Sequence, residues 1–397
     1  MAFTDYVYRE VGGILYGERA FALFLAALAD HVEQLTIVGR LDPEGGACHY
    51  PLPPEIEFVA LPHYSSLSRP AAVTDSLIRS LGRFWRALDR ADRVWLLGPY
   101  PHAVAFALIS RIRRRPLVLG VRQDFPTYVR SRRPGKRWMH LGADLLERSW
   151  RWLARGSPVV AVGPELARQY RIAPALLEIV VSLVRDADIE QGSRAAGRSY
   201  AGGLRAISVG RLDAEKNPLL LAAILSALRR EDPRWELLVC GEGPMRAELE
   251  RELASLGVAD HAELRGYVPV HDGLLELYRS SHAFLHVSLT EGMPQVLVEA
   301  FASGVPVVAT SVGGVADAAG DAALLIAPSD SAAAVSALER IASDERLRNR
   351  LIAAGLQRAS TQTLDAEVAR VAAFIERDGW RSAKPRSAGA PPRSGEG

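Results

Sequence analysis

Short β-rich runs alternate with helical stretches along most of this 397-residue chain, and this alternation restricts the fold more than any other feature. From about residue 205 the β-rich runs are 206–209, 236–240, 264–268, 284–288, 305–310 and 323–326. Weaker runs precede them at 35–38, 56–59, 94–97, 117–119 and 159–162. Such alternation predicts parallel strands joined by helices. Because the chain is too long for one small core, we expect two doubly wound, Rossmann-like α/β domains that face a cleft.

The expected domain boundaries follow from local composition. Residues 186–203 are polar, contain glycine and lack periodicity, which is typical of a linker. This places one domain at 1–185 and the other at 204–362. A C-terminal helix at 363–382 is expected to return toward the first domain. Residues 383–397 are rich in Pro, Ser, Gly and Arg and are expected to be disordered.

The composition is that of a globular protein, with 48% hydrophobic residues, 24% charged residues and a formal net charge of +2. Cys48 and Cys240 are the only cysteines, which excludes a disulfide framework and a zinc cluster and suits a reducing cytosol. The start lacks the pattern of a signal peptide. The apolar run 21–29 is far shorter than the roughly 20 residues of a membrane span, so it predicts a buried core helix. We therefore expect a cytoplasmic protein.

Two carboxylates, Glu291 and Glu299, bracket the start of a short amphipathic helix. Pro294 suits the first helical turn, and Gly292, Gln295 and Glu299 would share one polar face. The unpaired N–H groups of a helix start attract phosphate, whereas carboxylates accept hydrogen bonds from hydroxyls. A nucleotide-sugar carries both kinds of group. The alternative is that Glu291 only complements the helix dipole and that Glu299 is a solvated surface residue.

Further candidate residues follow other strands of the second domain, at the edge where open α/β sheets bind ligands. Arg211 and Lys216 are two cations suited to a diphosphate. Gly241 and Gly243 lie in a turn whose small residues permit close approach of the backbone to a ring, and Tyr267 supplies an aromatic group. Each has an ordinary alternative: a solvated loop, a plain turn or a core aromatic residue. Their shared position favours one ligand site.

The motifs at 210–212, 291–299, 304–310 and 313–314 resemble, in this order, the donor domain of the retaining family 4 glycosyltransferases, which have the GT-B fold. The resemblance covers about residues 205–360. It implies an enzyme of the hexosyltransferase type that moves a sugar from a nucleotide-diphosphate-sugar to a hydroxyl acceptor. The first domain would bind the acceptor, and the product would be a polysaccharide, a glycolipid or another glycoconjugate.

The resemblance also implies a role for each candidate residue. Arg211 and Lys216 would hold the diphosphate, Glu299 would accept hydrogen bonds from the ribose hydroxyls, and Glu291 would contact the donor sugar. The other implied donor-binding groups are the backbone N–H groups of Gly292, Met293 and Gln295 at the distal phosphate, and Tyr267, Val268, Gly241 and Gly243 at the base.

In the first domain, Gly12 and Gly13 resemble the glycine-rich loop that approaches the donor phosphates. The strand before this loop is normally long and apolar, whereas only residues 1–9 precede the loop here, with Tyr6, Val7 and Tyr8 as the apolar part. We expect either a shortened start or a wrongly assigned start codon. The family often has a histidine or an acid after the strand at 117–119. This chain offers Arg122, Gln123 and Asp124, of which Asp124 is our choice as a catalytic residue.

The implied mechanism needs positive charge rather than a base. Arg211, Lys216 and the helix start would neutralise the leaving diphosphate, whose oxygen can take the acceptor proton. Glu291 would then position the donor sugar. We expect no cofactor and no metal, because nothing in the sequence resembles an Asp-x-Asp metal site and two cations already balance the charge.

Basic residues interleaved with aromatic residues at 111–115 and 130–152 indicate a possible partner. Such a segment can lie on an anionic membrane, which predicts a lipid-linked acceptor and peripheral contact with the inner face of the plasma membrane. The alternative is a solvated basic helix face. Nucleic acid is not expected as a partner, since no base-reading motif is present.

Two other enzyme classes share a doubly wound fold. An NAD(P)-dependent oxidoreductase fits poorly, because Arg246 occupies the third glycine position after Gly241 and Gly243. A sugar-nucleotide epimerase would use a similar diphosphate site and keep the sugar. A non-catalytic partner subunit is disfavoured by the intact Arg211 and Lys216, together with both carboxylates.

Overall fold

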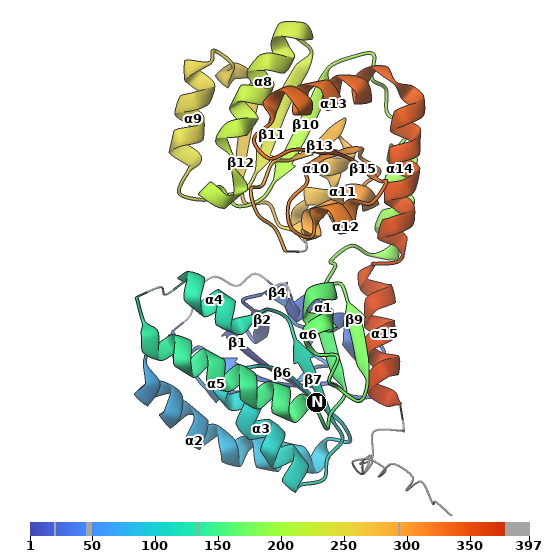
Figure 1. The fold of residues 1–397 in the computed structure, drawn as a ribbon. Helices are drawn as coiled ribbons and strands as arrows, with labels where there is room; N and C mark the ends of the chain where they lie inside the picture. Colours follow the sequence, from blue (N-terminus) through green and yellow to red (C-terminus); the bar gives the residue numbers. More distant parts are fainter. Residues whose placement is uncertain (20, 45–49, 133–134, 293, 378–397) are drawn as a thin grey trace, which may run out of the picture. The chain divides into compact units, whose positions relative to one another are not determined.

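The computed structural model describes residues 1–377 except 20, 45–49, 133–134 and 293 (Figure 1). The chain divides into two compact units. Unit 1 comprises Met1–Val180 and the residues from Val368 onward, and unit 2 comprises Val181–Glu367. The tail predicted at 383–397 lies outside the described residues. Each unit is built around its own sheet.

The sheet of unit 1 has a parallel core. Its order is β5 (Glu57–Pro62), β3 (Thr36–Leu41), β1 (Ala2–Val11), β6 (Val94–Gly98), β7 (Leu117–Val121), β8 (Val159–Val162) and β9 (Leu176–Ile179). The far part of β1 leaves this core as an antiparallel hairpin with β2 (Ile14–Gly17), which pairs with β4 (Tyr50–Pro51). The first strand is 10 residues long, and the expectation about the start of the chain is untested.

Gly12 and Gly13 form the turn of this hairpin. Their φ angles are 60° and 79°, as a two-residue turn with positive φ at both central positions requires. The pairing Val11 to Ile14 closes the turn. The two glycines are thus explained by the hairpin, and their predicted approach to donor phosphates stays untested.

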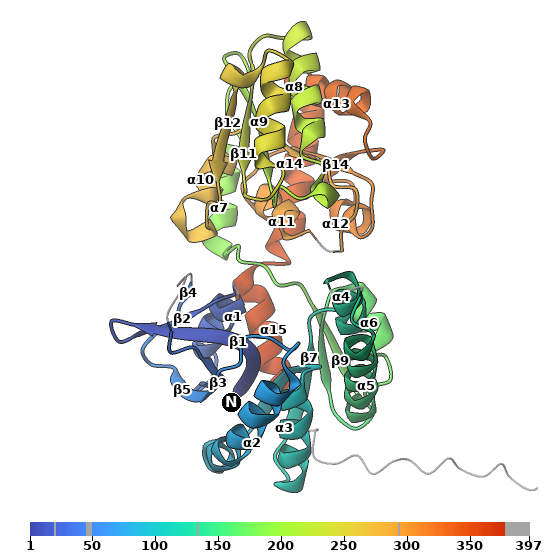
Figure 2. The same ribbon diagram turned by 90° about the vertical axis from the view of Figure 1, so that its left-hand side faces the viewer.

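Helices cover the sheet of unit 1 (Figure 2). They are α1 (Phe21–Ala29), α2 (Pro70–Ala87), α3 (Pro101–Ile112), α4 (Phe125–Arg132), α5 (Arg137–Ala154) and α6 (Pro164–Gln169). Proline opens α2, α3 and α6, where its missing N–H has no intrahelical partner. The apolar run predicted as a buried helix is α1, with Phe21, Phe24 and Leu25 buried, so this prediction is confirmed. From Val368 on, helix α15 (Leu364–Glu376) belongs to unit 1.

The sheet of unit 2 is entirely parallel. Its order is β12 (Ala262–Gly266), β11 (Trp235–Cys240), β10 (Leu204–Val209), β13 (Ala283–His286), β14 (Val307–Thr310) and β15 (Ala323–Ile326). The chain builds outward from β10 in one direction and then from β13 in the other. This makes the carboxyl ends of β10 and β13 the topological switch point, where such sheets bind ligands.

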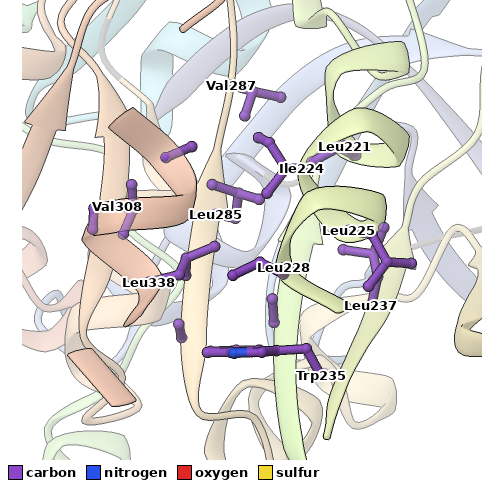
Figure 3. Packing of buried hydrophobic residues seen from close by; sticks show 14 of the residues in the cluster. Leu221, Ile224, Leu225, Leu228, Trp235, Leu237, Leu285, Val287, Val308 and Leu338 are labelled. Carbon is purple, nitrogen blue, oxygen red and sulfur yellow. The ribbon is translucent and has the colours of Figure 1, made fainter. Parts of the chain in front are cut away.

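Two apolar cores fix this sheet between helix layers. On one face, α8 (Leu219–Glu231), α9 (Arg246–Ser255) and α13 (Ser331–Ser343) pack on the strands, and Figure 3 shows leucines of α8 and α13 meeting Trp235, Leu237 and Leu285. The other face is covered by α10 (Leu274–Arg279), α11 (Gln295–Ala302) and α12 (Val315–Ala319). Helix α14 (Glu345–Ser360) contributes to both cores. The strand ends that carry candidate residues are thereby held by buried packing.

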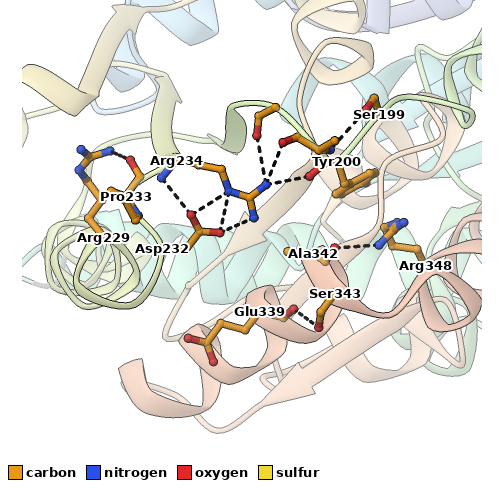
Figure 4. A network of polar contacts seen from close by, with 12 residues as sticks. Ser199, Tyr200, Arg229, Asp232, Pro233, Arg234, Glu339, Ala342, Ser343 and Arg348 are labelled. Carbon is orange, nitrogen blue, oxygen red and sulfur yellow. Dashed lines mark hydrogen bonds and ion pairs between the residues drawn. The ribbon is translucent and has the colours of Figure 1, made fainter.

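The segment predicted to be an aperiodic linker is structured. Its first part is helix α7 (Asp186–Ala195), which begins with an acidic first turn. Gly192 of α7 lies so close to α11 that an added Cβ would be 1.9 Å from the carbonyl oxygen of Ala302. Further on, Arg234 binds Asp232 and donates to the carbonyl oxygens of residues 200–202 (Figure 4). The polar composition of this segment did not predict its structure, because the contacts at Gly192 and at residues 200–202 are made through backbone atoms.

Candidate functional site

A cavity of about 240 Å³ opens at the switch point of unit 2. Its walls come from the residues that follow β10 and β13 and from the start of α11. The lining residues with polar side chains are Ser208, Arg211, Lys216, His286, Ser288, Glu291 and Gln295. Four predicted site residues, Arg211, Lys216, Glu291 and Gln295, therefore line one cavity.

Glu291 is the one carboxylate among the described residues that line this cavity. Its Oε1 accepts hydrogen bonds from Lys216 Nζ at 2.5 Å, from Ser288 Oγ at 2.8 Å and from His286 Nε2 at 3.0 Å. His286 Nε2 must carry a proton to donate to an ionised carboxylate. Burial opposes the charge of Glu291, yet these donors together lower its pKa to about 2. Glu291 is therefore ionised and fixed in orientation at neutral pH.

The second oxygen of Glu291 is differently placed. All three hydrogen bonds end on Oε1, and no other described side chain donates to Oε2. A carboxylate oxygen can accept further hydrogen bonds when its partner oxygen is saturated. Oε2 is thus the part of Glu291 that can receive a ligand hydroxyl.

The loop that carries Glu291 is tied down on two sides. Thr310 Oγ1 donates to the carbonyl oxygen of Ser288 at 2.7 Å, and Leu289 N donates to the carbonyl oxygen of Glu215 at 2.8 Å. Gly313 has φ of +51°, and an added Cβ would lie 1.9 Å from the carbonyl oxygen of Glu291. Thr310 and Gly313, for which the sequence suggested no role, support the site from behind.

Arg211 occupies the outer part of the cavity. Its side chain is 56% exposed and pairs with Asp213 and Glu215. Lys216 is only 22% exposed and ends the short 3-10 helix Ala214–Lys216. The two cations therefore differ: Lys216 is held within the site, whereas Arg211 must exchange acidic partners to bind a phosphate.

The start of α11 faces this cavity. Pro294 is the residue before the helix and is buried, so it stands one position earlier than predicted. Gln295 is the first helical residue, and its exposed side chain lines the cavity. Gly292 is exposed as well. Met293, predicted to contact the distal phosphate, lies outside the described residues.

Glu299 is buried rather than solvated, with 7% of its surface exposed, so it does not share an exposed face with Gln295. Its Oε2 accepts a hydrogen bond from the Tyr278 hydroxyl at 3.2 Å. Burial raises its pKa to about 7, against the opposing effect of the Tyr278 hydrogen bond. Glu299 does not line the cavity that holds Glu291. The surface alternative is wrong for this residue, and its predicted ribose contact stays a prediction.

The glycines after β11 serve backbone packing. An added Cβ on Gly241 would lie 1.8 Å from the carbonyl oxygen of Gly210, and one on Gly243 would lie 2.5 Å from that of Leu212. The turn after β11 thus rests directly on the loop that carries Arg211. Gly241 and Gly243 do not line the cavity. Their close approach is to protein backbone, whereas the prediction was an approach to a ring.

Tyr267 and Val268 follow β12, at the edge of the sheet. The Tyr267 side chain is 53% exposed, so the alternative of a core aromatic residue is wrong for it. Val268 packs against the core under α10 and α11. Neither residue lines the cavity at the switch point, and their predicted contact with a base is untested.

In unit 1, Asp124 precedes α4 and its Oδ1 accepts a hydrogen bond from Thr127 N at 3.0 Å. This bond satisfies one of the unpaired N–H groups at the helix start and explains an aspartate at this position. The neighbouring Arg122, which we passed over, lines a second cavity in unit 1 instead. The catalytic role predicted for Asp124 therefore gains nothing from the geometry.

Sequence reasoning missed His286 and Ser288, both of which bind Glu291. His286 is the last residue of β13, and Ser288 follows this strand. A search for polar residues at strand carboxyl ends, which selected Arg211 after β10, would also have found them. Tyr278, the partner of Glu299, gave no such signal because it lies within α10. Within the described parts of the chain, no group of three or more His, Cys, Asp or Glu side chains is arranged to hold a metal ion. Nor is any helix there both long enough and apolar enough to span a membrane.

Comparisons with known proteins show what the chain resembles. Residues 191–358 match the sequence model of the family described as glycosyl transferases group 1. D-inositol 3-phosphate glycosyltransferase of Frankia alni is 32% identical over 207 residues, which cover 48% of this chain and 50% of that protein. The chain spans about half or less of the length of the curated relatives it matches.

Solved structures share the fold at low sequence identity. An α,α-trehalose-phosphate synthase (UDP-forming) of Burkholderia vietnamiensis aligns with a TM-score of 0.66 and 16% identity, over 94% of this chain and 96% of that one. HepE of Anabaena, solved in complex with UDP and glucose, aligns with a TM-score of 0.62 and 16% identity, over 94% and 98% of the two chains. At such identities the similarity establishes the fold, which is GT-B.

Proposed function

We propose that this chain is a retaining glycosyltransferase, because residues 191–358 match the sequence model of the family described as glycosyl transferases group 1. It moves a sugar from a nucleotide-diphosphate-sugar to a hydroxyl acceptor. One observation carries the proposal: Lys216, which can neutralise a phosphate, and Glu291, which can bind a hydroxyl, meet in one cavity at the switch point of unit 2. A donor that carries both groups fits this pair.

The diphosphate is held by charge. Lys216 has three N–H donors, of which the bond to Glu291 uses one. Arg211 lines the same cavity and adds a planar set of donors, and the N–H groups at the start of α11 add a partial positive charge. Each charged hydrogen bond contributes roughly 1.5–3 kcal/mol. These groups favour the departing diphosphate more than the intact donor.

The sugar and the nucleoside are held by carboxylates. Glu291 binds a hydroxyl of the donor sugar through Oε2, since its Oε1 is already occupied. Glu299 accepts the ribose hydroxyls. Because these two carboxylates differ in burial and in pKa, they respond to pH in different ways.

The transfer step requires no side-chain base. The bond between the anomeric carbon and the diphosphate oxygen breaks, and a bond to the acceptor oxygen forms on the same face of the sugar. The acceptor proton passes to the departing phosphate oxygen, while the bonding electrons leave with the diphosphate. Lys216 and Arg211 stabilise the charge that develops there. The two cations do this work, so no metal is needed in the proposed step.

A thermal-shift screen of nucleoside diphosphates and their sugars tests this proposal. HepE was solved with UDP, so UDP and UDP-glucose are the first probes. We expect at least one nucleotide-sugar to raise the melting temperature, and the same donor to release nucleoside diphosphate on turnover. An epimerase would change the sugar and keep it attached, so an altered nucleotide-sugar without release of diphosphate would contradict the proposal. A product of inverted anomeric configuration would contradict the retaining mechanism.

The acceptor is proposed to be lipid-linked at an anionic membrane, because α5 has an exposed apolar stripe. Trp138, Leu141, Leu145 and Trp152 share one face of α5 and are 49–72% exposed. Arg148 and Arg151 are exposed beside them. Membrane-surface helices combine such an apolar face with flanking cations. Contact with the headgroups would bring the enzyme to its substrate.

A further inference from the structure

A second cavity, of about 410 Å³, lies in unit 1. Its lining comes from β1 and β3 and from the residues that follow β5, β6 and β7. It therefore occupies the ligand-binding edge of its own sheet, as the first cavity does in unit 2. The proposed donor site leaves this cavity without a function.

The lining of this cavity has one more positive than negative side chain. Five ionisable carboxylates and guanidiniums line it, and two pairs cancel: Arg40 with Asp5, and Arg19 with Glu18. Arg40 also donates to the carbonyl oxygens of Asp5 and Tyr64, while its Nε lies 3.3 Å from Asp5 Oδ1 as an ion pair without a hydrogen bond. Arg122 is the one remaining cation of this lining.

Arg122 has no anionic partner among the described residues. Its guanidinium carbon lies 4.3 Å from the ring centre of Phe21 and 5.3 Å from that of Tyr6, so aromatic faces hold it in place. Its Nε is buried and makes no hydrogen bond to a described group. Burial alone lowers its pKa to about 10. A guanidinium that is only partly exposed and lacks a counter-charge is costly to the ligand-free protein.

Aromatic and hydroxyl groups form the rest of the wall. Tyr6, Tyr64, Tyr100 and Phe125 line the cavity, and Ser65 and Ser66 contribute hydroxyls. Tyr100 packs edge to face on Phe125, with ring centres 5.5 Å apart. The Tyr64 hydroxyl already donates to Asp5 Oδ2 at 2.6 Å. The other flat rings suit the apolar face of a sugar or polyol ring, and the hydroxyls of Tyr6, Tyr100 and the serines suit its hydroxyl groups.

We propose that this cavity binds a sugar or polyol that carries a phosphate or carboxylate, with Arg122 as the counter-charge of that anionic group. The inference rests on the proposed function, because the bound molecule is then the acceptor or its headgroup. The cavity supplies what each part requires: one uncompensated guanidinium for the anion and aromatic walls for the ring. Asp5 and Arg40 act only as a rigid part of the wall.

Calorimetric titration of the full chain with glucose 6-phosphate, glucuronate, glucose and inorganic phosphate tests this inference. We expect glucose 6-phosphate or glucuronate to bind at least about tenfold more tightly than glucose, since a charged hydrogen bond is gained. The stronger of these two identifies the anion as phosphate or carboxylate. Equal binding of glucose and both anionic sugars, or no binding by any probe, would overturn the proposal.

Arg122→Gln should abolish the preference for the anionic sugar. Arg90→Gln, which changes a side chain that is 81% exposed, is the matched control and should retain it. Without ligand, Arg122→Gln should be at least as stable as the unaltered chain, because an uncompensated charge is removed. A purely structural arginine would instead cost stability, and that result would overturn the assignment. UDP binding is measured on the same samples. If the unaltered chain does not bind UDP, the proposed donor site in unit 2 is contradicted, whereas the proposed sugar site in unit 1 is not.

Discussion

Lys216 Nζ lies 2.5 Å from Glu291 Oε1, although 75 residues separate the two in sequence. The contact joins the loop after β10 to the loop after β13 across the switch point of the sheet. It places a cation for phosphate directly beside an anion for hydroxyls. The proposed donor site is built on this pair, and most of the predictions below alter the pair or its supports.

Glu291→Gln should lower the free energy of unfolding at neutral pH. The folded-state pKa of about 2 lies below the ordinary value of 4.5, so the stabilisation is present above pH 4.5 and is lost as the pH falls toward 2. The shift corresponds to about 3 kcal/mol. Urea unfolding at pH 7 and at pH 2.5 measures it, with the exposed Glu248→Gln as control. An equal loss of stability at both pH values would refute the assigned ionisation.

Glu299→Gln should behave in the opposite way. The folded-state pKa of about 7 lies above 4.5, so the folded form binds the proton more tightly and loses stability as the pH rises from 4.5 to 7. At pH 8 the variant should therefore have a free energy of unfolding about 3 kcal/mol higher than that of the parent and should unfold at a higher urea concentration. At pH 4 the two free energies should differ little. It should also bind UDP more weakly by calorimetry. Unchanged UDP affinity would remove Glu299 from the ribose site.

Gly313→Ala should weaken donor binding. The new Cβ would collide with the carbonyl oxygen of Glu291 at 1.9 Å, so the loop that carries Glu291 must shift. Gly257→Ala is a matched control, because Gly257 also has positive φ and meets no atom within 4 Å. Both variants carry backbone strain of about 1–3 kcal/mol, whereas only the first should lose affinity for the nucleotide-sugar. Parallel losses of affinity in the two would show that strain alone is responsible.

Membrane contact by α5 predicts sedimentation of the protein with anionic vesicles at low salt. Replacing Trp138, Leu141 and Leu145 by serine should leave the variant in the supernatant, because both aromatic and aliphatic contacts are removed. Leu256→Ser, in unit 2, alters an exposed leucine elsewhere and should not change sedimentation. If the parent protein is recovered entirely in the supernatant, membrane contact by α5 is contradicted and the alternative of a solvated basic helix face holds.

The alternation of strands and helices was sufficient to predict the sheet of unit 2 and most parallel strands of unit 1, because burial on two faces gives parallel strands continuous apolar runs. It missed β2, β4 and β9. It also led to Arg211, Lys216 and Glu291, since the strand ends of one sheet meet at one edge. Helix α7 was missed because its contact with α11 runs through Gly192 and the backbone, which composition does not reveal. The hairpin at Gly12 and Gly13 was missed because β1 continues beyond its parallel partners.

Ionisation states were beyond the sequence for a related reason. Glu291 and Glu299 are the same residue type at a regular spacing, yet one is ionised by three donors and the other is buried with a single tyrosine. Lys216 reaches Glu291 from the segment after β10, His286 and Ser288 come from the residues just before Glu291, and Tyr278 reaches Glu299 from α10. The same applies to Arg122, whose missing counter-charge becomes visible only when its neighbours are known.

Release of nucleoside diphosphate by Lys216→Ala tests the central claim most directly. The donor found in the screen is incubated with the parent chain, with Lys216→Ala and with Arg230→Ala, which alters an exposed arginine of α8. We expect Lys216→Ala to fold, as judged by circular dichroism, and to lose turnover by roughly tenfold to a hundredfold or more, because a charged hydrogen bond to the leaving group is removed. Arg230→Ala should retain full turnover. A folded Lys216→Ala variant that releases diphosphate at the parental rate would contradict the proposed donor site.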